Sequence, residues 1–421
     1  MPAPDVRASH RRLIFLFGLA YFAQGMGQAG GLISQPLSYY LKQGLGYNAA
    51  EVADYLAILT LPWIIKPVYG LVSDFVPLFG YRRKTWLMLV NFAAATGFLW
   101  LSGLTDAGTI IVALTLTAFG TAASDVIVDA LMVENGERTG QTARFQGVQW
   151  MWFKLAAIIT ALAGGTIAAM FTPATALHVA ATFTMLAPIA VLTASYLLVR
   201  EDRAVINLDQ FRETTRSLVE AFRSPTLRIA AAFLALWCFS PGFGTPMYYH
   251  MVDTLGFDQK FIGQLAALTA AGAVVGAWMF ARVFSRRTVT WRAVFSIVAA
   301  FFGILIYLGI AQPHAHAAAI AVPLSVTFGM AAQIGTLTIL TLAASACPPR
   351  AEGFVFAALM SLYNGVEQLS AIAGARLYQH VFDRQIAPLL WVAAGCFLLC
   401  LALVPTLKRL EQQPARPRAT G

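Results

Sequence analysis

Two aspartates lie one helical turn apart inside a long apolar run. Asp125 and Asp129 have the i, i+4 spacing that puts both side chains on one face of a helix. A carboxylate in an apolar helix has to face a cavity or a cation. We therefore predict that Asp125 contacts a solute or carries a proton. The alternative, which applies most to Asp129, is that the two acids belong to an ion cluster at the helix end.

Other polar side chains lie deep in apolar runs. Lys154 and Glu367 are near the middle of two such runs, with Asn364 one turn before Glu367. Lys154 could hold a carboxylate of a solute, and Glu367 could bind a proton or the polar edge of a ring. A structural ion pair between Lys154 and Glu367 is the alternative. Lys66 precedes a proline that bends its helix, so it is either a cation in a cavity or a donor that stabilises the bend.

Helix-breaking residues recur at matching depths in the first and seventh apolar runs. Gln24 opens the segment QGMG, and Pro241, Gly242 and Gly244 belong to the segment PGFGTP. Such residues permit bending or close helix packing. We expect an outer gate at these two segments and count Gln24 among the candidate solute contacts. Tight packing of small residues is the alternative.

A charged cluster is predicted around the loop after the second apolar run. Asp74 stands at a helix end, and Arg82 and Arg83 follow in the loop. An acid at a helix end can face the positive N-terminus of another helix. The arginines can pair with acids at the foot of a neighbouring helix, for which Asp129 and Glu134 are the candidates. Arginines that only set the membrane orientation are the alternative.

The composition shows what kind of protein positions these residues. Of 421 residues, 58% are apolar and 12% are charged, whereas soluble domains carry about 25% charged residues. Apolar runs of roughly 20 residues recur, which is typical of membrane-spanning helices rather than of a barrel. We predict an all-α membrane protein with twelve spans. Their ranges are 12–39, 50–73, 84–103, 108–133, 143–171, 175–199, 227–252, 259–283, 291–311, 315–345, 351–380 and 386–407.

The basic residues predict the orientation of these spans. If the N-terminus is cytoplasmic and the spans alternate, 23 of the 29 lysines and arginines fall on the cytoplasmic side and three on the other. This bias follows the positive-inside rule and explains the net charge of +9 without a nucleic-acid partner. We expect a multi-pass protein of the cell inner membrane with both termini in the cytoplasm.

A polar stretch midway divides the predicted spans into two sets of six. We expect an N-terminal half at 1–199, a cytoplasmic linker at 200–226, a C-terminal half at 227–410 and a cytoplasmic tail at 411–421. Short similarities between the halves, such as the double arginines after the second and eighth spans, suggest a repeat around a central cavity. Secondary transporters are built in this way.

Residues 61–83, LPWIIKPVYGLVSDFVPLFGYRR, resemble the signature of the folate–biopterin transporter family within the major facilitator superfamily. Further blocks of the sequence agree with this family: YFAQG at 21–25, ASDVIVDAL at 123–131, LGF at 255–257 with FIG at 261–263, and CPPRAEG at 347–353 followed by FAALMS at 356–361. The resemblance covers nearly all the predicted spans.

The resemblance implies the major facilitator fold and a secondary transporter of a folate- or pterin-like solute. It also implies that the cluster around Asp74 is a cytoplasmic latch that holds the outward-facing state. We expect protons as the coupling ion, a monomer in the lipid bilayer, no cofactor and no metal. The alternatives are another solute, such as a nucleoside-like metabolite, a cell-wall fragment or a drug, and a non-transporting receptor or membrane enzyme. The sequence has no P-loop, HExxH or GxSxG motif, which argues against an ATP-driven pump or an enzyme of those kinds.

Overall fold

The computed structural model describes residues 6–201, 203, 224–347 and 352–407. In these ranges the regular elements are helices, and the only strand-like feature is an isolated bridge between Leu78 and Tyr81. Contacts divide the chain into two compact units. The first is Met1–Glu213 with Met251–Ala270, and the second is Thr214–His250 with Ala271–Gly421. Most of the predicted linker and the whole predicted tail lie outside the described residues, so the predicted domain boundaries stay a prediction.

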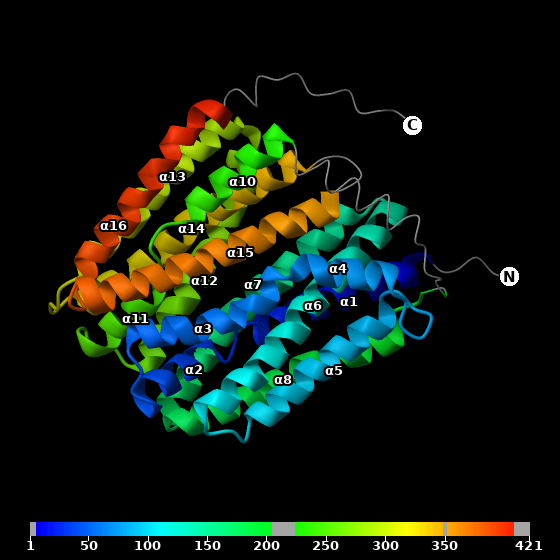
Figure 1. The fold of residues 1–421 in the computed structure, drawn as a ribbon, viewed down its shortest axis with the longest axis horizontal. Helices are drawn as coiled ribbons and strands as arrows, with labels where there is room; N and C mark the ends of the chain where they lie inside the picture. Colours follow the sequence, from blue (N-terminus) through cyan, green and yellow to red (C-terminus); the bar gives the residue numbers. More distant parts are fainter. Residues whose placement is uncertain (1–5, 202, 204–223, 348–351, 408–421) are drawn as a thin grey trace. The chain divides into compact units, whose positions relative to one another are not determined.

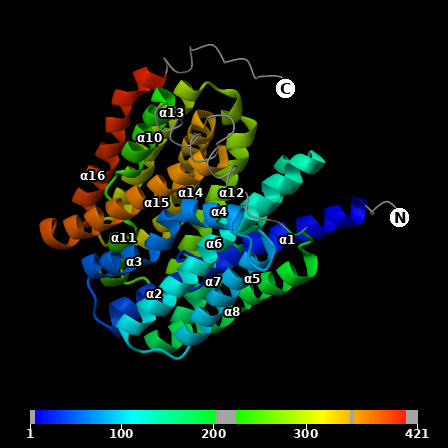
Figure 2. The same cartoon turned by 45° about the vertical axis from the view of Figure 1, so that its right-hand side comes forward.

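Within the described residues, the first unit contains eight complete α-helices in chain order, together with the end of α11 and the start of α12 (Figure 1). A π-helical turn, η1 at Tyr40–Gly44, extends α2. The helices are α1 Val6–Gly27, α2 Ser34–Tyr39, α3 Ala49–Ile64, α4 Lys66–Phe75, α5 Lys84–Leu101, α6 Ala107–Thr139, α7 Thr142–Met170 and α8 Pro173–Leu198. Two views show α5, α6 and α8 side by side (Figures 1 and 2).

The second unit contains the remaining helices, and α11 and α12 each cross its boundary. Both views show α13 beside α16 (Figures 1 and 2). Short 3₁₀ or π segments extend four of the helices: η2 Phe284–Arg286, η3 Ile306–Ile310, η4 Leu377–Val381 and η5 Cys400–Leu403. The helices are α10 Pro225–Cys238, α11 Gly244–Asp253, α12 Gln259–Arg282, α13 Val289–Leu305, α14 Ala317–Ala346, α15 Glu352–Arg376 and α16 Ile386–Leu399.

The twelve predicted spans correspond to helices or to consecutive helix pairs of the described chain. Eight helical stretches in the described ranges are long and apolar enough to cross a membrane, judged by length and composition. The other four spans are α1 with α2, α5, α10 with α11, and α15. Two of these four, α1 with α2 and α10 with α11, are broken into two helices, so neither contains a single helix that is long and apolar enough by itself. The chain is an all-α, multi-pass integral membrane protein.

Local sequence explains where several helices begin and bend. Asn48 caps α3 and forms a capping box with Glu51. Asp258 accepts a hydrogen bond of 2.7 Å from the backbone N–H of Phe261 and so caps α12. Pro67 separates α3 from α4, because a proline cannot donate a backbone hydrogen bond and its ring crowds the preceding turn. This break places Lys66 at the first position of α4.

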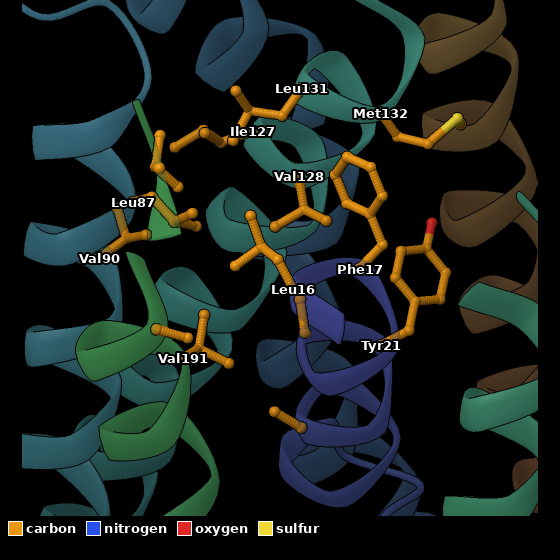
Figure 3. Packing of buried hydrophobic residues seen from close by; sticks show 14 of the residues in the cluster. Leu16, Phe17, Tyr21, Leu87, Val90, Ile127, Val128, Leu131, Met132 and Val191 are labelled. Atoms are coloured by element: carbon orange, nitrogen blue, oxygen red, sulfur yellow. The ribbon is translucent and has the colours of Figure 1, made fainter. Parts of the chain in front are cut away.

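The core of the first unit lies where α1, α5, α6 and α8 meet. Leu16 and Phe17 of α1 point toward Val128 of α6 (Figure 3). The ring centres of Phe17 and Phe145 are 5.2 Å apart, which adds α7 to this core. Gly120 allows α5 and α6 to approach closely, since a Cβ there would come within 2.8 Å of the Cβ of Ala94. These contacts fix the helices that carry the polar side chains described next.

Candidate functional site

A buried ion pair joins α4 to α6 in the first unit. Lys66 Nζ lies 2.6 Å from Asp125 Oδ2, and the two side chains are 15% and 6% exposed. The ammonium also lies 4.7 Å from the ring centre of Trp63, one turn earlier on α3. The helix break at Pro67 therefore puts a cation beside the aspartate that the sequence singles out. The structure brings Lys66 and Asp125 together across 59 residues of chain.

Asp129, one turn further along α6, has a different set of partners. Tyr21 of α1 donates a hydrogen bond from its hydroxyl to Asp129 Oδ1. Gln149 Nε2 of α7 donates to the same oxygen over 3.4 Å. Among the described contacts, Asp129 is held by these two neutral donors and not by Arg82 or Arg83. Sequence reasoning did not single out Tyr21 and Gln149, although Tyr21 belongs to the block YFAQG.

Aromatic side chains line the same region of α1 and α7. Tyr21, Trp150 and Phe153 meet edge to face, with ring centres 5.6 to 6.5 Å apart. Lys154 Nζ lies 6.0 Å from the ring centre of Trp150 and 5.9 Å from that of Phe153. Trp150 remains 41% exposed. The aromatic faces, a lysine and two carboxylates thus lie on adjacent helices of one unit.

A small cavity with some polar lining lies between α1, α5, α6 and α8. Gln24, Asn91, Ser124 and Asp125 contribute its polar lining, and Tyr21 borders it. Asn91 Nδ2 donates to Ser124 Oγ over 2.9 Å, whereas Gln24 Oε1 is buried without a hydrogen-bond partner in the described chain. The cavity measures about 20 Å³, which suits a water molecule rather than a metabolite. Gln24 therefore lines a small cavity together with Asp125, and its predicted contact with a solute stays a prediction.

Asn364 and Glu367 belong to α15 of the second unit, whereas Lys154 belongs to the first. Glu367 is accessible to solvent in the structure, and Asn364 is partly buried. The predicted solute contacts of Asn364 and Glu367, and the alternative pairing of Lys154 with Glu367, remain predictions.

The predicted charged cluster forms at the ends of α4 and α6. Arg83, only 4% exposed, pairs with Asp74 and lies 2.9 Å from Glu134. Arg82 lies 3.6 Å from Glu134 and 3.9 Å from Asp74. Ser73 Oγ accepts a further hydrogen bond of 2.8 Å from the Arg83 guanidinium. Two acids and two arginines thus tie the loop before α5 to the neighbouring helix ends.

Glu201 adds a contact to this loop that the sequence analysis missed. Its carboxylate accepts hydrogen bonds of 3.0 to 3.1 Å from the backbone N–H groups of Arg82, Arg83 and Lys84. These groups form the N-terminus of α5, which carries the positive end of the helix dipole. An acid is expected near the N-terminus of a helix. Glu201 and Arg83 are 118 residues apart in the sequence, however, so the sequence did not indicate which acid would bind this helix start.

The break between α10 and α11 contains the predicted gate residues of the second unit. Gly242 donates a backbone hydrogen bond of 2.8 Å to Ser370 O of α15, and Ser370 Oγ donates to Ser240 O. A Cβ on Gly242 would lie 2.9 Å from the Cα of Ala371, whereas a Cβ on Gly244 would meet nothing within 4 Å. Pro241 lies in the non-helical segment between the two helices. Gly242 is therefore a close-packing position, and Gly244 has room.

Comparison with known proteins decides the family. The BT1 family model matches residues 24–412. This chain belongs to the BT1 family. The folate-biopterin transporter of Synechocystis sp. is 30% identical, over 85% of this chain and 73% of the relative. The probable folate-biopterin transporter 4 of Arabidopsis thaliana is 23% identical, over 91% of this chain and 90% of the relative. The family resemblance predicted from residues 61–83 is confirmed.

Solved structures show the fold of this BT1-family chain. The nucleoside transporter NupG aligns with a TM-score of 0.68 at 12% identity, covering 96% of this chain and 99% of that protein. A D-xylose-proton symporter aligns with a TM-score of 0.71 at 11% identity, covering 95% and 97%. The predicted major facilitator fold is confirmed, and the chain is a membrane transporter rather than an enzyme.

Proposed function

We propose that this chain is a secondary transporter that moves a folate- or pterin-like solute across the cell inner membrane and couples this movement to protons. The relatives named as folate-biopterin transporters support the solute class. The observation that carries the proposal is the grouping of Asp125, Lys66 and Lys154 with the aromatic rings of Trp150 and Phe153 in one unit. The chain acts as a monomer with both termini in the cytoplasm.

The chemistry of a folate matches these side chains. Its pterin ring is flat and aromatic, so it can stack on a ring such as Trp150. The ring edge carries N–H groups that can donate hydrogen bonds to a carboxylate such as that of Asp125. The glutamate tail carries carboxylates that can pair with the ammonium group of Lys154. Asn364 and Glu367 on α15 are proposed to complete the solute site from the second half, with Gln24 as a further contact.

Proteoliposomes test the function directly. Vesicles holding the purified chain should exchange radiolabelled folic acid or biopterin, while a nucleoside serves as the comparison solute. Exchange of the nucleoside but of neither pterin would overturn the proposed solute class. Absence of exchange for all three would overturn transport of these solutes. The resemblance to the nucleoside transporter shows the fold alone and gives no reason to prefer that solute.

Lys154 offers a sharper test of how the solute binds. Lys154→Met should weaken binding of folic acid much more than binding of biopterin, which lacks the glutamate tail. A charge-assisted hydrogen bond contributes about 1.5–3 kcal/mol, so affinity for folic acid should fall on the order of 10- to 100-fold. Lys154→Arg keeps the charge and is the matched control. Equal losses for the two solutes would make Lys154 a structural residue.

We also propose that the break at Pro241, Gly242 and Gly244 serves as an outer gate. Gly244→Ala has room for its methyl group, so any slowing of exchange would come from reduced backbone freedom at the break. Gly242→Ala would push against α15 and should lower stability as well as turnover. Turnover equal to wild type in both variants would contradict the gate.

A further inference from the structure

The charged side chains around α6 do not balance. Asp125 and Asp129 share one helix face, and Lys66 is the cation that contacts this pair, through Asp125. Asp129 is held only by the hydroxyl of Tyr21 and the amide of Gln149 in the described chain. When both acids are ionised, the group carries one negative charge more than it has positive charges. A group inside a membrane protein can remove such an excess by binding a proton.

The hydrogen bonds on Asp129 leave one of its oxygens open. Tyr21 and Gln149 both donate to Oδ1, and no hydrogen bond of the described chain reaches Oδ2. Asp129 is also partly exposed, whereas Asp125 is buried against Lys66. Oδ2 of Asp129 is therefore an open oxygen on the more accessible of the two acids, and this acid has no cation beside it.

Gln149 provides a partner for either protonation state of Asp129. The residue is 0% exposed, and its Oε1 is buried without a hydrogen-bond partner in the described chain. Its Nε2 donates to the carboxylate as the structure stands. Rotation of the amide by half a turn would turn Oε1 toward Asp129, so that Gln149 could accept a hydrogen bond when the protonated carboxyl group presents its O–H to the amide. Oε1 gains a partner in that orientation and Nε2 loses one, so one amide atom is unpaired in either state.

We propose that Asp129 is the proton-binding residue of this transporter and that Tyr21 and Gln149 are positioning residues that hold its carboxyl group in both protonation states. This inference deepens the proposed function and rests on it for the coupling role. One proton from water on one side of the membrane adds to Oδ2 and later leaves to water on the other side. No bond of the solute is made or broken in this step.

Charged and polar groups near Asp129 come from α1, α4, α6 and α7, and Lys154 of α7 lies beyond the rings of Trp150 and Phe153. Lys66 comes from α4, Asp125 from α6 itself and Tyr21 from α1, while α7 presents the neutral amide of Gln149. Asn91 of α5, which contacts Ser124 of α6, is also neutral. Lys66 compensates the charge of Asp125 at 2.6 Å. The two aspartates thus differ in their partners, because Asp125 has a cation and Asp129 has neutral donors.

Infrared spectroscopy of the purified full-length chain in lipid tests this assignment without a solute. Acidification should produce the carbonyl stretch of a protonated carboxylic acid, and the difference between wild type and Asp129→Asn isolates this residue. The component of the band that belongs to Asp129 should be lost in Asp129→Asn and retained in Glu367→Gln. Asp106→Asn, at the other end of α6, is the matched control because Asp106 only caps that helix.

Tyr21→Phe separates positioning from a merely structural role. Loss of the phenol hydrogen bond should shift the frequency of the Asp129 band, because that bond is made to the carboxyl group itself. A Tyr21→Phe spectrum equal to that of wild type would overturn the role of Tyr21.

Each outcome of the variant series is decisive. A spectrum of Asp129→Asn equal to that of wild type overturns the proposal, because Asp129 then contributes no protonated acid. In proteoliposomes, Asp129→Asn should lose accumulation of folic acid driven by a pH gradient, with exchange still detectable. A wild-type band without folic acid or biopterin exchange would overturn the proposed function while leaving the proton site intact.

Discussion

Two clusters in the first unit use the same kinds of side chain but balance their charges differently. The cluster at the ends of α4 and α6 pairs Arg82 and Arg83 with two acids, Asp74 and Glu134. The cluster around Asp125 has one lysine for two carboxylates. The first set is neutral as a whole, and the second carries a negative charge when both acids are ionised.

The two clusters also differ in their contact with solvent. Asp74 and Glu134 are 37% and 47% exposed, so water screens them even if a partner is lost. Asp125 is 6% exposed and depends on Lys66. A balanced, half-exposed cluster is suited to hold a loop in place, and an unbalanced, buried one is suited to respond to a proton or a solute.

The largest effect should follow from removing the cation of the buried cluster. Lys66→Met leaves Asp125 buried without a counter-charge, which typically costs about 3–5 kcal/mol of folding free energy. Thermal unfolding of the purified protein would measure it. The double variant Lys66→Met with Asp125→Asn should recover much of the loss, because no unpaired charge remains. A stable single variant would mean that the pair is not buried in the membrane-embedded protein.

A smaller loss is expected from the matching change in the balanced cluster. Arg83→Met removes contacts to Asp74, Glu134 and Ser73, but both acids are half-exposed and keep Arg82 nearby. We expect about 1–3 kcal/mol in the same unfolding measurement. Arg83→Lys keeps the charge without the guanidinium fork and should fall in between. A loss as large as that of Lys66→Met would remove the distinction between the clusters.

The latch role of the balanced cluster can be tested by conformation rather than stability. Asp74→Asn should weaken the outward-facing state by about 1 kcal/mol, which changes the ratio of states roughly fivefold. Distances between spin labels at the cytoplasmic ends of the two halves would report that ratio. Unchanged distance distributions would leave Asp74 as a residue of the loop fold only.

The smallest effect should come from the linker acid that caps α5. Glu201→Gln keeps a hydrogen-bond acceptor but removes the charge at the helix N-terminus, which is worth about 0.3–1 kcal/mol. Thermal unfolding would detect this as a minor shift, and Glu201→Ala should cost more because the acceptor is also lost. If Glu201→Ala were neutral, the three backbone hydrogen bonds would contribute no net stability.

The sequence determined the membrane fold and the family. Lipid offers no hydrogen-bond partners, so each span must satisfy its backbone as a helix, and apolar length and composition then reveal eight of the twelve predicted spans in the described ranges. Local features also follow from the sequence. The capping box at Asn48 and Glu51 and the helix break at Pro67 depend only on residues within one or two turns of each other. Residues 61–83 indicated the family because the residues of its signature lie in one continuous segment, which can be read without knowing the tertiary structure.

Tertiary structure decided the partners of the charged residues. Lys66 and Asp125 are 59 residues apart, and Tyr21 and Asp129 are 108 apart. The spacing of Asp125 and Asp129 places them on one helix face, but it cannot say that one meets a lysine and the other a tyrosine. That division depends on how α1, α4 and α7 pack around α6, because burial and the nearest neighbour, rather than residue type, set the role of each carboxylate.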